Sequence, residues 1–370
     1  MSRATDNLFL VLASAFAFGC SDAPVTPVRA SALSPSLPSL DREVSKGARF
    51  PTATTYAVIG DVPYGLIKRA ELPRLVDQIN ADGAVSAVVH VGDIRQGKKG
   101  EDIVQEPLGG CADAQLLDIR AQFDRFQKPL VYTPGDNEWT DCHHDSGKLN
   151  GNYVPTERLQ RLREIFFPVP GVTLGVPRLV LSQAFDPRHS DYVENVMWIA
   201  SGVVFATINL PGSDNDWTPW GTVPNGGAGY PSQTEEQTTR GQADADWIDA
   251  AFAAATALHA PGLVLAFQAD MWNKDDIVLH LAAVTNQIGA RAIRFGKPVL
   301  LLQGDSHLYR DDHPYTPFEF SFKQPTAPYA PNVTRIVVQG ELNSTEYLRL
   351  TIDPRSPAGL FTWARVPLAP

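Results

Sequence analysis

Four times along this chain, a short apolar run ends in the dipeptide Gly-Asp. The runs read VIGD, HVGD, YTPGD and LQGD, and their acids are Asp61, Asp93, Asp136 and Asp305. Ligand sites in α/β sheets collect at the carboxyl ends of strands, and glycine lets the backbone turn so that the next side chain faces the crevice. Taken singly, each pair is an ordinary turn signal. Together they predict that the four acids form a shared site of hard oxygen ligands.

The rest of the sequence alternates between short buried strands and amphipathic helices. Apolar, β-branched runs predict strands at residues 56–59, 85–91, 130–133, 203–209, 263–267, 299–302, 335–338 and 347–352. Most lack strict polar alternation, as do strands that are covered on both faces. Helical spacing predicts helices at 72–79, with Pro73 in the first turn, and at 116–126, 159–166, 247–255 and 277–284. This order predicts an α/β fold, with a long irregular loop at 212–237.

A histidine follows the last of the four acids two residues further on, in GDSH. Carboxylates are hard oxygen ligands, and His307 would add an imidazole nitrogen to them. Divalent cations are bound by such mixed sets of ligands. The sequence therefore predicts a metal site built from strand ends.

The first 20 residues resemble an export signal. Arg3 precedes an apolar run at residues 8–18, which is too short for a membrane span and ends in AFGCSD, where Gly19-Cys20 resembles a bacterial lipobox. We expect export to the periplasm or the cell exterior, with either a lipid anchor at Cys20 or cleavage nearby. Residues 21–53, rich in Pro, Ser and Ala, are expected to form a flexible tether to a single domain at 54–370.

Two further cysteines, Cys111 and Cys142, remain in the exported part of the chain. An even pair in an oxidising compartment favours a disulfide bond, and two unpaired buried thiols are the alternative. A bond here would anchor the loop TPGDNEWTDC, which carries Asp136.

The order of these blocks resembles the calcineurin-like metallophosphoesterases over residues 54–353. Their strand-end motifs run Asp-x-His, Gly-Asp, Gly-Asn-His-Glu/Asp, a lone His, and Gly-His-x-His. The resemblance implies two mixed β-sheets packed as a sandwich and flanked by helices. It also implies a hydrolase with two metal ions.

Carried over, Asp61 matches the first acid, Asp93 the acid that bridges both metals, and His307 the last histidine. Asp136, Gln268 and Asp305 stand where the family has asparagine and two histidines, and Asp270 could exchange roles with Gln268. Two carboxylates and an amide make a hard, negative site. Mn, Mg or Ca is therefore expected there, with Fe or Zn as further options.

Other departures concern proton transfer. Asn137 replaces the histidine that acts on the leaving group, and an amide cannot deliver a proton to an alkoxide. His143 and His144 are candidates for that role. Pro63 replaces the histidine of the first motif, and the adjacent Tyr64 is either a ligand or part of the pocket wall.

The resemblance implies an exported phosphoesterase that hydrolyses a phosphomonoester or phosphodiester with a metal-bound hydroxide at Asp93. The alternative is a catalytically impaired relative that binds a metal or ligand at the cell surface. A formal net charge of −10 argues against a nucleic-acid surface. The expected partner is a small phosphoester or ligand, and a lipid at Cys20 would be the one contact with a membrane.

Overall fold

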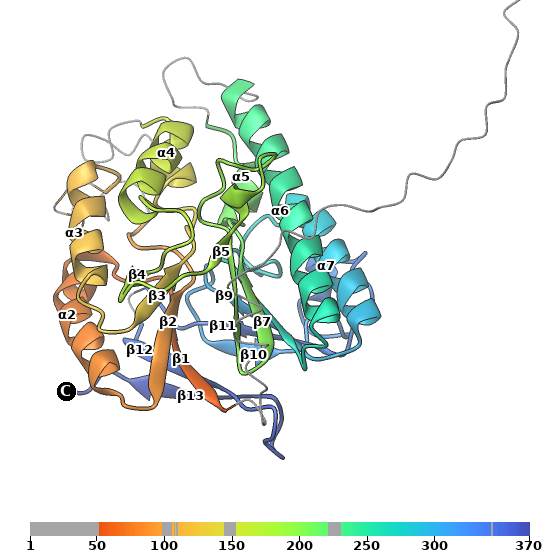
Figure 1. Cartoon of the computed structure of the whole chain (residues 1–370). Coiled ribbons are helices and arrows are strands. Elements are labelled where there is room, and N and C mark those ends of the chain that lie inside the picture. Colours follow the sequence, from red (N-terminus) through yellow and green to blue (C-terminus); the bar gives the residue numbers. More distant parts are fainter. Residues whose placement is uncertain are drawn as a thin grey trace, which may run out of the picture. The chain divides into compact units, whose positions relative to one another are not determined.

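Two mixed β-sheets lie face to face at the centre of the fold (Figure 1). The first contains, in spatial order, β13 (Phe361–Pro367), β12 (Glu346–Ile352), β1 (Thr54–Ile59), β2 (Val85–His90), β3 (Pro129–Tyr132) and β4 (Leu174–Gly175). The second contains β10 (Arg310–Asp312), β11 (Val333–Val337), β9 (Val299–Gln303), β8 (Leu263–Ala266), β7 (Val203–Thr207), β6 (Val196–Ala200) and β5 (Leu181–Ser182). Strands β1, β2 and β3 are parallel neighbours, as are β7, β8, β9 and β11.

Helices cover the outer faces of both sheets. The helices are α2 (Gly65–Ala81), α3 (Asp113–Phe123), α4 (Pro155–Phe166), α5 (Gly212–Asp216), α6 (Pro231–Ala257) and α7 (Ala282–Phe295), with 3-10 turns η2 (Thr140–His143), η3 (Gln183–Phe185), η4 (Leu279–Leu281) and η5 (Ser321–Lys323). Figure 1 shows α2, α3 and α4 on one side of the sheets and α6 and α7 on the other. The predicted fold class, α/β with two mixed sheets flanked by helices, is confirmed.

Strand β1 shows why the apolar runs do not alternate with polar residues. Tyr56 and Val58 point into the layer between the two sheets, whereas Ala57 and Ile59 pack against the helices on the outer face. Successive side chains of a strand point to opposite faces, so a strand covered on both sides is apolar throughout.

The computed structural model describes residues 52–97, 106, 108, 110–143, 153–220, 231–341 and 343–370. The expected signal, Cys20, nearly all of the tether and His144 lie outside these residues. Within them, no helix is both long and apolar enough to cross a membrane.

All eight predicted strands are present, with shifts at their ends. Five further strands were not predicted, namely β4, β5, β6, β10 and β13. Strands β4 and β5 have two residues each, and β10 reads Arg-Asp-Asp, so their extended backbone is defined by pairing with neighbours. Local pattern could not reveal these three strands, whereas β6 reads VMWIA, an apolar run that the prediction missed.

Three predictions about helices were wrong in detail. Pro73 lies inside α2, because the helix begins earlier at Gly65, whose amide donates to Glu106 Oε1 at 3.0 Å. The predicted helix at 277–284 is not continuous. Residues 277–278 have no regular structure, η4 follows as a 3-10 turn, and α7 begins only at Ala282. The side chain of Asp214 accepts a hydrogen bond from the His280 amide at 2.8 Å and holds that turn apart from the helix. The expected loop at 212–237 contains α5 and the start of α6; its residues 221–230 lie outside the described part.

The predicted disulfide between Cys111 and Cys142 is present. It lies under the loop of Asp136, because both sulfurs approach the Asn137 carbonyl oxygen, at 3.9 and 3.7 Å. Arg95, fully buried, donates to the same carbonyl oxygen. The bond is consistent with an extracellular protein.

Removal of this bond is expected to destabilise the fold. Closing a loop of 31 residues contributes about 3 to 4 kcal/mol in the chain-entropy model, so a Cys111→Ala/Cys142→Ala variant should lose about that much free energy of unfolding. Chemical denaturation measures it. Thiol titration of the denatured exported protein should find neither cysteine reactive, and two titratable thiols would refute the bond.

Candidate metal centre

The four strand-end acids converge where the carboxyl ends of β1, β2, β3 and β9 meet. Three of them adopt left-handed backbone conformations, with φ of 53° at Asp61, 60° at Asp93 and 71° at Asp305, and His307 has φ of 62°. This region is costly for residues other than glycine and is concentrated at functional sites. The backbone is thus held in the conformation that turns these side chains into one cluster.

The ligand atoms form two groups. Within each group, all ligand atoms lie within 4.8 Å of one another. One group is Asp61, Asp93 and His307, and the other is Asp93, Asp136 and Asp305. Asp93 belongs to both groups, in the bridging position that the resemblance implied. Five of the six predicted ligands are therefore brought together.

Gln268, the sixth predicted ligand, lies between the carboxylates. Its Nε2 is 3.0 Å from Asp93 Oδ2 and 3.0 Å from Asp136 Oδ1, and its Oε1 accepts from the Gly212 amide. Its amide thus joins the carboxylates of the second group. The alternative residue, Asp270, is paired with the buried Arg335 and accepts from the Trp272 amide at 2.9 Å.

The ligand atoms fit a divalent cation. Asp61 Oδ2 is buried and has no hydrogen-bond partner, which is costly for a carboxylate oxygen unless a cation is its partner. The donors are four carboxylates, an amide and one imidazole, a set that suits hard cations. The residues present therefore fit a divalent metal ion.

Glycines allow the surrounding backbone to approach these carboxylates. A Cβ at Gly135 would lie 2.0 Å from Asp93 Oδ1, and one at Gly212 would lie 2.7 Å from Asp136 Oδ2 and 2.8 Å from Asp305 Oδ1. Any side chain at either position would displace a ligand atom.

Without a cation, burial and mutual repulsion favour protonated acids. Desolvation raises the pKa of Asp61 to about 6, although His307 opposes it. Burial, followed by neighbouring carboxylates, also raises the pKa of Asp93, Asp136 and Asp305 well above the usual range. Metal binding should therefore release protons.

Tyr64 lies inside the cluster. Its hydroxyl donates to Asp93 Oδ2 at 2.9 Å, accepts from Asn137 Nδ2 at 2.5 Å and lies 3.4 Å from His307 Nε2. Burial and the nearby carboxylates raise the pKa of this phenol well above its ordinary value. Tyr64 is therefore a neutral hydrogen-bond donor at the bridging acid.

Two glutamates that sequence reasoning missed hold the ligands in place. Glu341 Oε2 lies 3.2 Å from His307 Nδ1, which leaves Nε2 facing Asp61. The buried Glu138 accepts from the amides of Asp93 at 3.1 Å and Gly135 at 2.7 Å, and from the Tyr132 hydroxyl at 2.7 Å. Its place two residues after Asp136, in GDNEW, was the available signal.

Loss of the Glu138 charge should loosen this site. In Glu138→Gln the negative charge is lost and the NH₂ group at the Oε2 position would face the Ile94 amide, so we expect metal affinity to fall by about 10- to 100-fold. Calorimetric titration with Mn²⁺ measures the change. The exposed Glu164→Gln is the control and should bind as wild type does. Equal affinities for both variants would contradict this role of Glu138.

Two further histidines, His143 and His90, bond to backbone carbonyl groups. His143 Nδ1 is 2.5 Å from the Thr140 carbonyl oxygen of its own turn, and its side chain is not part of the cavity lining. His90 is buried, and its Nε2 lies 3.0 Å from the Val62 carbonyl oxygen. His143 is thus bonded to its own turn, and its catalytic role stays a prediction.

A left-handed turn also contributes to the site. Ser213, Asp214, Asn215 and Asp216 have φ between 48° and 65°, an unusual run for residues other than glycine. Arg240, fully buried, donates to Asn215 Oδ1 at 2.6 Å and holds the turn on α6. The turn places Ser213 Oγ 3.0 Å from Asp136 Oδ2 and 2.6 Å from Asp141 Oδ1.

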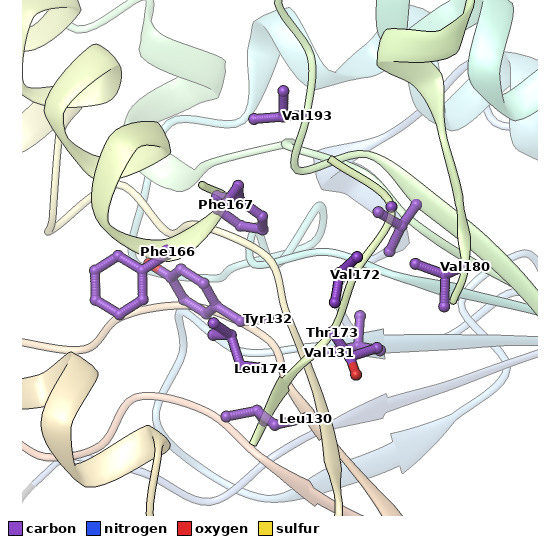
Figure 2. Close-up of a pocket in the computed structure, with 12 residues that line it drawn as sticks. Leu130, Val131, Tyr132, Phe166, Phe167, Val172, Thr173, Leu174, Val180 and Val193 are labelled. Atoms are coloured by element: carbon purple, nitrogen blue, oxygen red, sulfur yellow. The ribbon is translucent and has the colours of Figure 1, made fainter. Parts of the chain in front are cut away.

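Four members of the cluster, Asp93, Asp136, Asp305 and His307, line a cavity of about 460 Å³. Tyr64, Asn137, Ser213 and Asp276 line it too. This volume suits a small molecule. A second cavity, between β3 and the loop after α4, has about 20 Å³ and an almost wholly apolar lining that includes Leu130, Phe166 and Val180 (Figure 2). It is a packing gap about the size of one water molecule.

Comparison with known proteins adds no functional assignment. No protein-family model matches the chain, and no curated protein matches it. Among solved structures, one entitled "GAP50 the anchor in the inner membrane complex of Plasmodium" matches with a TM-score of 0.40 and 9% identity, over 86% of this chain and 90% of that one. Similarity at this level carries no argument about function.

Proposed function

We propose that the chain is an exported, metal-dependent phosphoesterase of the calcineurin-like type. The observation that carries this proposal is the position of Asp93, which is shared by two groups of ligands beside a cavity large enough for a small phosphoester. Asp61, Asp93 and His307 would hold one cation, and Asp93, Asp136 and Asp305 the other. Two bound cations would polarise the phosphoryl group and activate water.

The residues around the cluster favour activated esters. The Tyr64 hydroxyl, now donated to Asp93, is placed to donate to a phosphoryl oxygen. Asn137 lies beside it and can orient the ester through its amide, but it cannot protonate a departing alkoxide. Substrates with good leaving groups should therefore react fastest.

The specific observation that favours a second function is the loss of histidines. Asn137 and Gln268 both lie in the site, at the positions where the related enzymes carry histidine. A protein that binds a metal or ligand without turnover would retain the acids and tolerate these changes.

Metal analysis and an activity assay separate the two functions. Purified protein soaked in Mn²⁺ should bind two equivalents and hydrolyse bis(4-nitrophenyl) phosphate or 4-nitrophenyl phosphate. Two bound metals without turnover would favour the binding function. No bound metal after soaking would refute both the metal centre and the hydrolase.

A further inference from the structure

The side chain of Gln268 is packed tightly inside the metal centre. Gln268 follows β8 and is fully buried. A Cβ on Gly92 would lie 2.8 Å from its Cβ, and a Cβ on Gly135 would lie 2.8 Å from its Cγ. These are the glycines that precede Asp93 and Asp136, so the two Gly-Asp motifs leave the space that this glutamine fills.

Three neighbours fix the orientation of the Gln268 amide group. Its Nε2 lies 3.0 Å from Asp93 Oδ2 and 3.0 Å from Asp136 Oδ1, and its Oε1 accepts from the Gly212 amide. The opposite orientation would turn the NH₂ group toward the Gly212 N–H and the oxygen toward two carboxylates. Buried polar groups that lose their partners are costly. The amide group therefore donates to two ligands and presents no lone pair to a cation between them.

The two groups of ligands consequently offer different donor atoms. The first group includes an imidazole nitrogen, His307 Nε2, which lies 3.5 Å from Asp61 Oδ1. The second group consists of the carboxylates of Asp93, Asp136 and Asp305, and all three line the cavity, where water can complete the ligand shell. Ca²⁺ takes about six to eight oxygen ligands, some of them water, whereas Zn²⁺ sites usually include nitrogen or sulfur.

We propose that Gln268 makes the second group a site for Ca²⁺ that discriminates against Zn²⁺, because it donates to Asp93 and Asp136 and does not ligate the cation. The first group, which contains His307, takes Zn²⁺ or a similar transition metal. This inference rests on the two-cation centre of the proposed function and not on its hydrolytic activity. Mn²⁺ suits carboxylate ligands as well, so protein soaked in Mn²⁺ alone still binds two equivalents.

Metal competition tests this assignment. Protein stripped with EDTA receives two equivalents of ZnCl₂ per chain in a millimolar excess of CaCl₂, and the bound metals are counted by mass spectrometry. Wild type should hold one Zn²⁺ and one Ca²⁺. Gln268→His places an imidazole beside the second group, so its preference for Zn²⁺ over Ca²⁺ should rise by about a hundredfold or more and the chain should hold two Zn²⁺. Gln160→His, exposed on α4, is the control and should hold one of each.

A second variant, Asp305→His, covers the case in which Gln268→His does not fold. Asp305 has φ of 71°, and a histidine already adopts this conformation at His307, with φ of 62°. This variant should also hold two Zn²⁺. Two Zn²⁺ in wild type, or Ca²⁺ retained beside Zn²⁺ in the folded variants, would overturn the inference. An inactive wild type that holds one of each metal would support it even though the hydrolase function fails, and a wild type without bound metal would overturn both.

Crystals of the loaded protein test the orientation of the amide group directly. Anomalous diffraction at the zinc edge should place Zn²⁺ beside His307, with Gln268 Nε2 still bonded to Asp93. Ca²⁺ bound to Gln268 Oε1 would show that the amide group is a ligand and would overturn the inference.

Discussion

Asp93→Asn is expected to abolish hydrolysis, lowering kcat/KM by about a thousandfold or more. The carboxylate belongs to both groups of ligands, so its neutralisation weakens both cation sites at once. Asp93 Oδ2 also accepts from Tyr64 and Gln268, and Oδ1 accepts from the Asn137 amide, so the NH₂ group of asparagine would replace an acceptor at one of these two positions. Without the metal ions, the activation free energy should rise by several kcal/mol, which corresponds to a fall in kcat/KM of about a thousandfold.

The control for this variant is Asp276→Asn. Asp276 lines the same cavity and belongs to neither group of ligands, so kcat/KM should change by less than about threefold. Metal content is measured alongside activity, with two equivalents expected for the control and fewer for Asp93→Asn. An Asp93→Asn protein that keeps both metals and full activity would exclude the proposed bridging role.

The stability of the metal-free protein should fall as pH rises from about 5 to 8. Burial raises the pKa of Asp61 from 3.8 to about 6, so the folded state holds a proton that the unfolded state has already released. The folded state binds more protons, and its stability therefore decreases as pH rises through about 6. Desolvation opposes the charge on His307, but Glu341 and Asp61 raise its pKa from 6.5 to about 8, and that stabilisation is lost as pH rises through 8. Both groups act in the same direction.

Mn²⁺ should reverse this trend, because it replaces protons among the carboxylates. At pH 8, metal at a hundred times its dissociation constant stabilises by about 2.7 kcal/mol per site, and two sites should raise Tm by about 10 °C. Thermal unfolding with EDTA or MnCl₂ at pH 5, 6, 7 and 8 measures both effects. Asp61→Asn is the diagnostic variant: metal-free, it should be more stable than wild type at pH 8, and Mn²⁺ should stabilise it less. A metal effect that is equal at pH 5 and pH 8 would contradict the argument.

Local pattern was a good guide to the inner strands. Tyr56 and Val58 face the other sheet, while Ala57 faces the helices. Both faces of β1 are therefore apolar, and the strand can be recognised in the sequence as a continuous apolar run. Strand β10 reads Arg-Asp-Asp and is extended because it pairs with β11. Such strands depend on a neighbour that is distant in sequence.

By itself, the sequence determined which acids end the strands. Gly-Asp after a buried run is a local signal, and it identified Asp61, Asp93, Asp136 and Asp305. Parallel direction sends the ends of β1, β2 and β3 to one edge of their sheet, whereas Asp305 follows β9 of the second sheet and meets the others because the two sheets pack together. Only the tertiary structure decided which side chains orient those acids. Glu341 and Ser213 reach the site from segments that local patterns do not connect with it, and Glu138 in the Asp136 loop accepts from the Asp93 amide, 45 residues away in sequence.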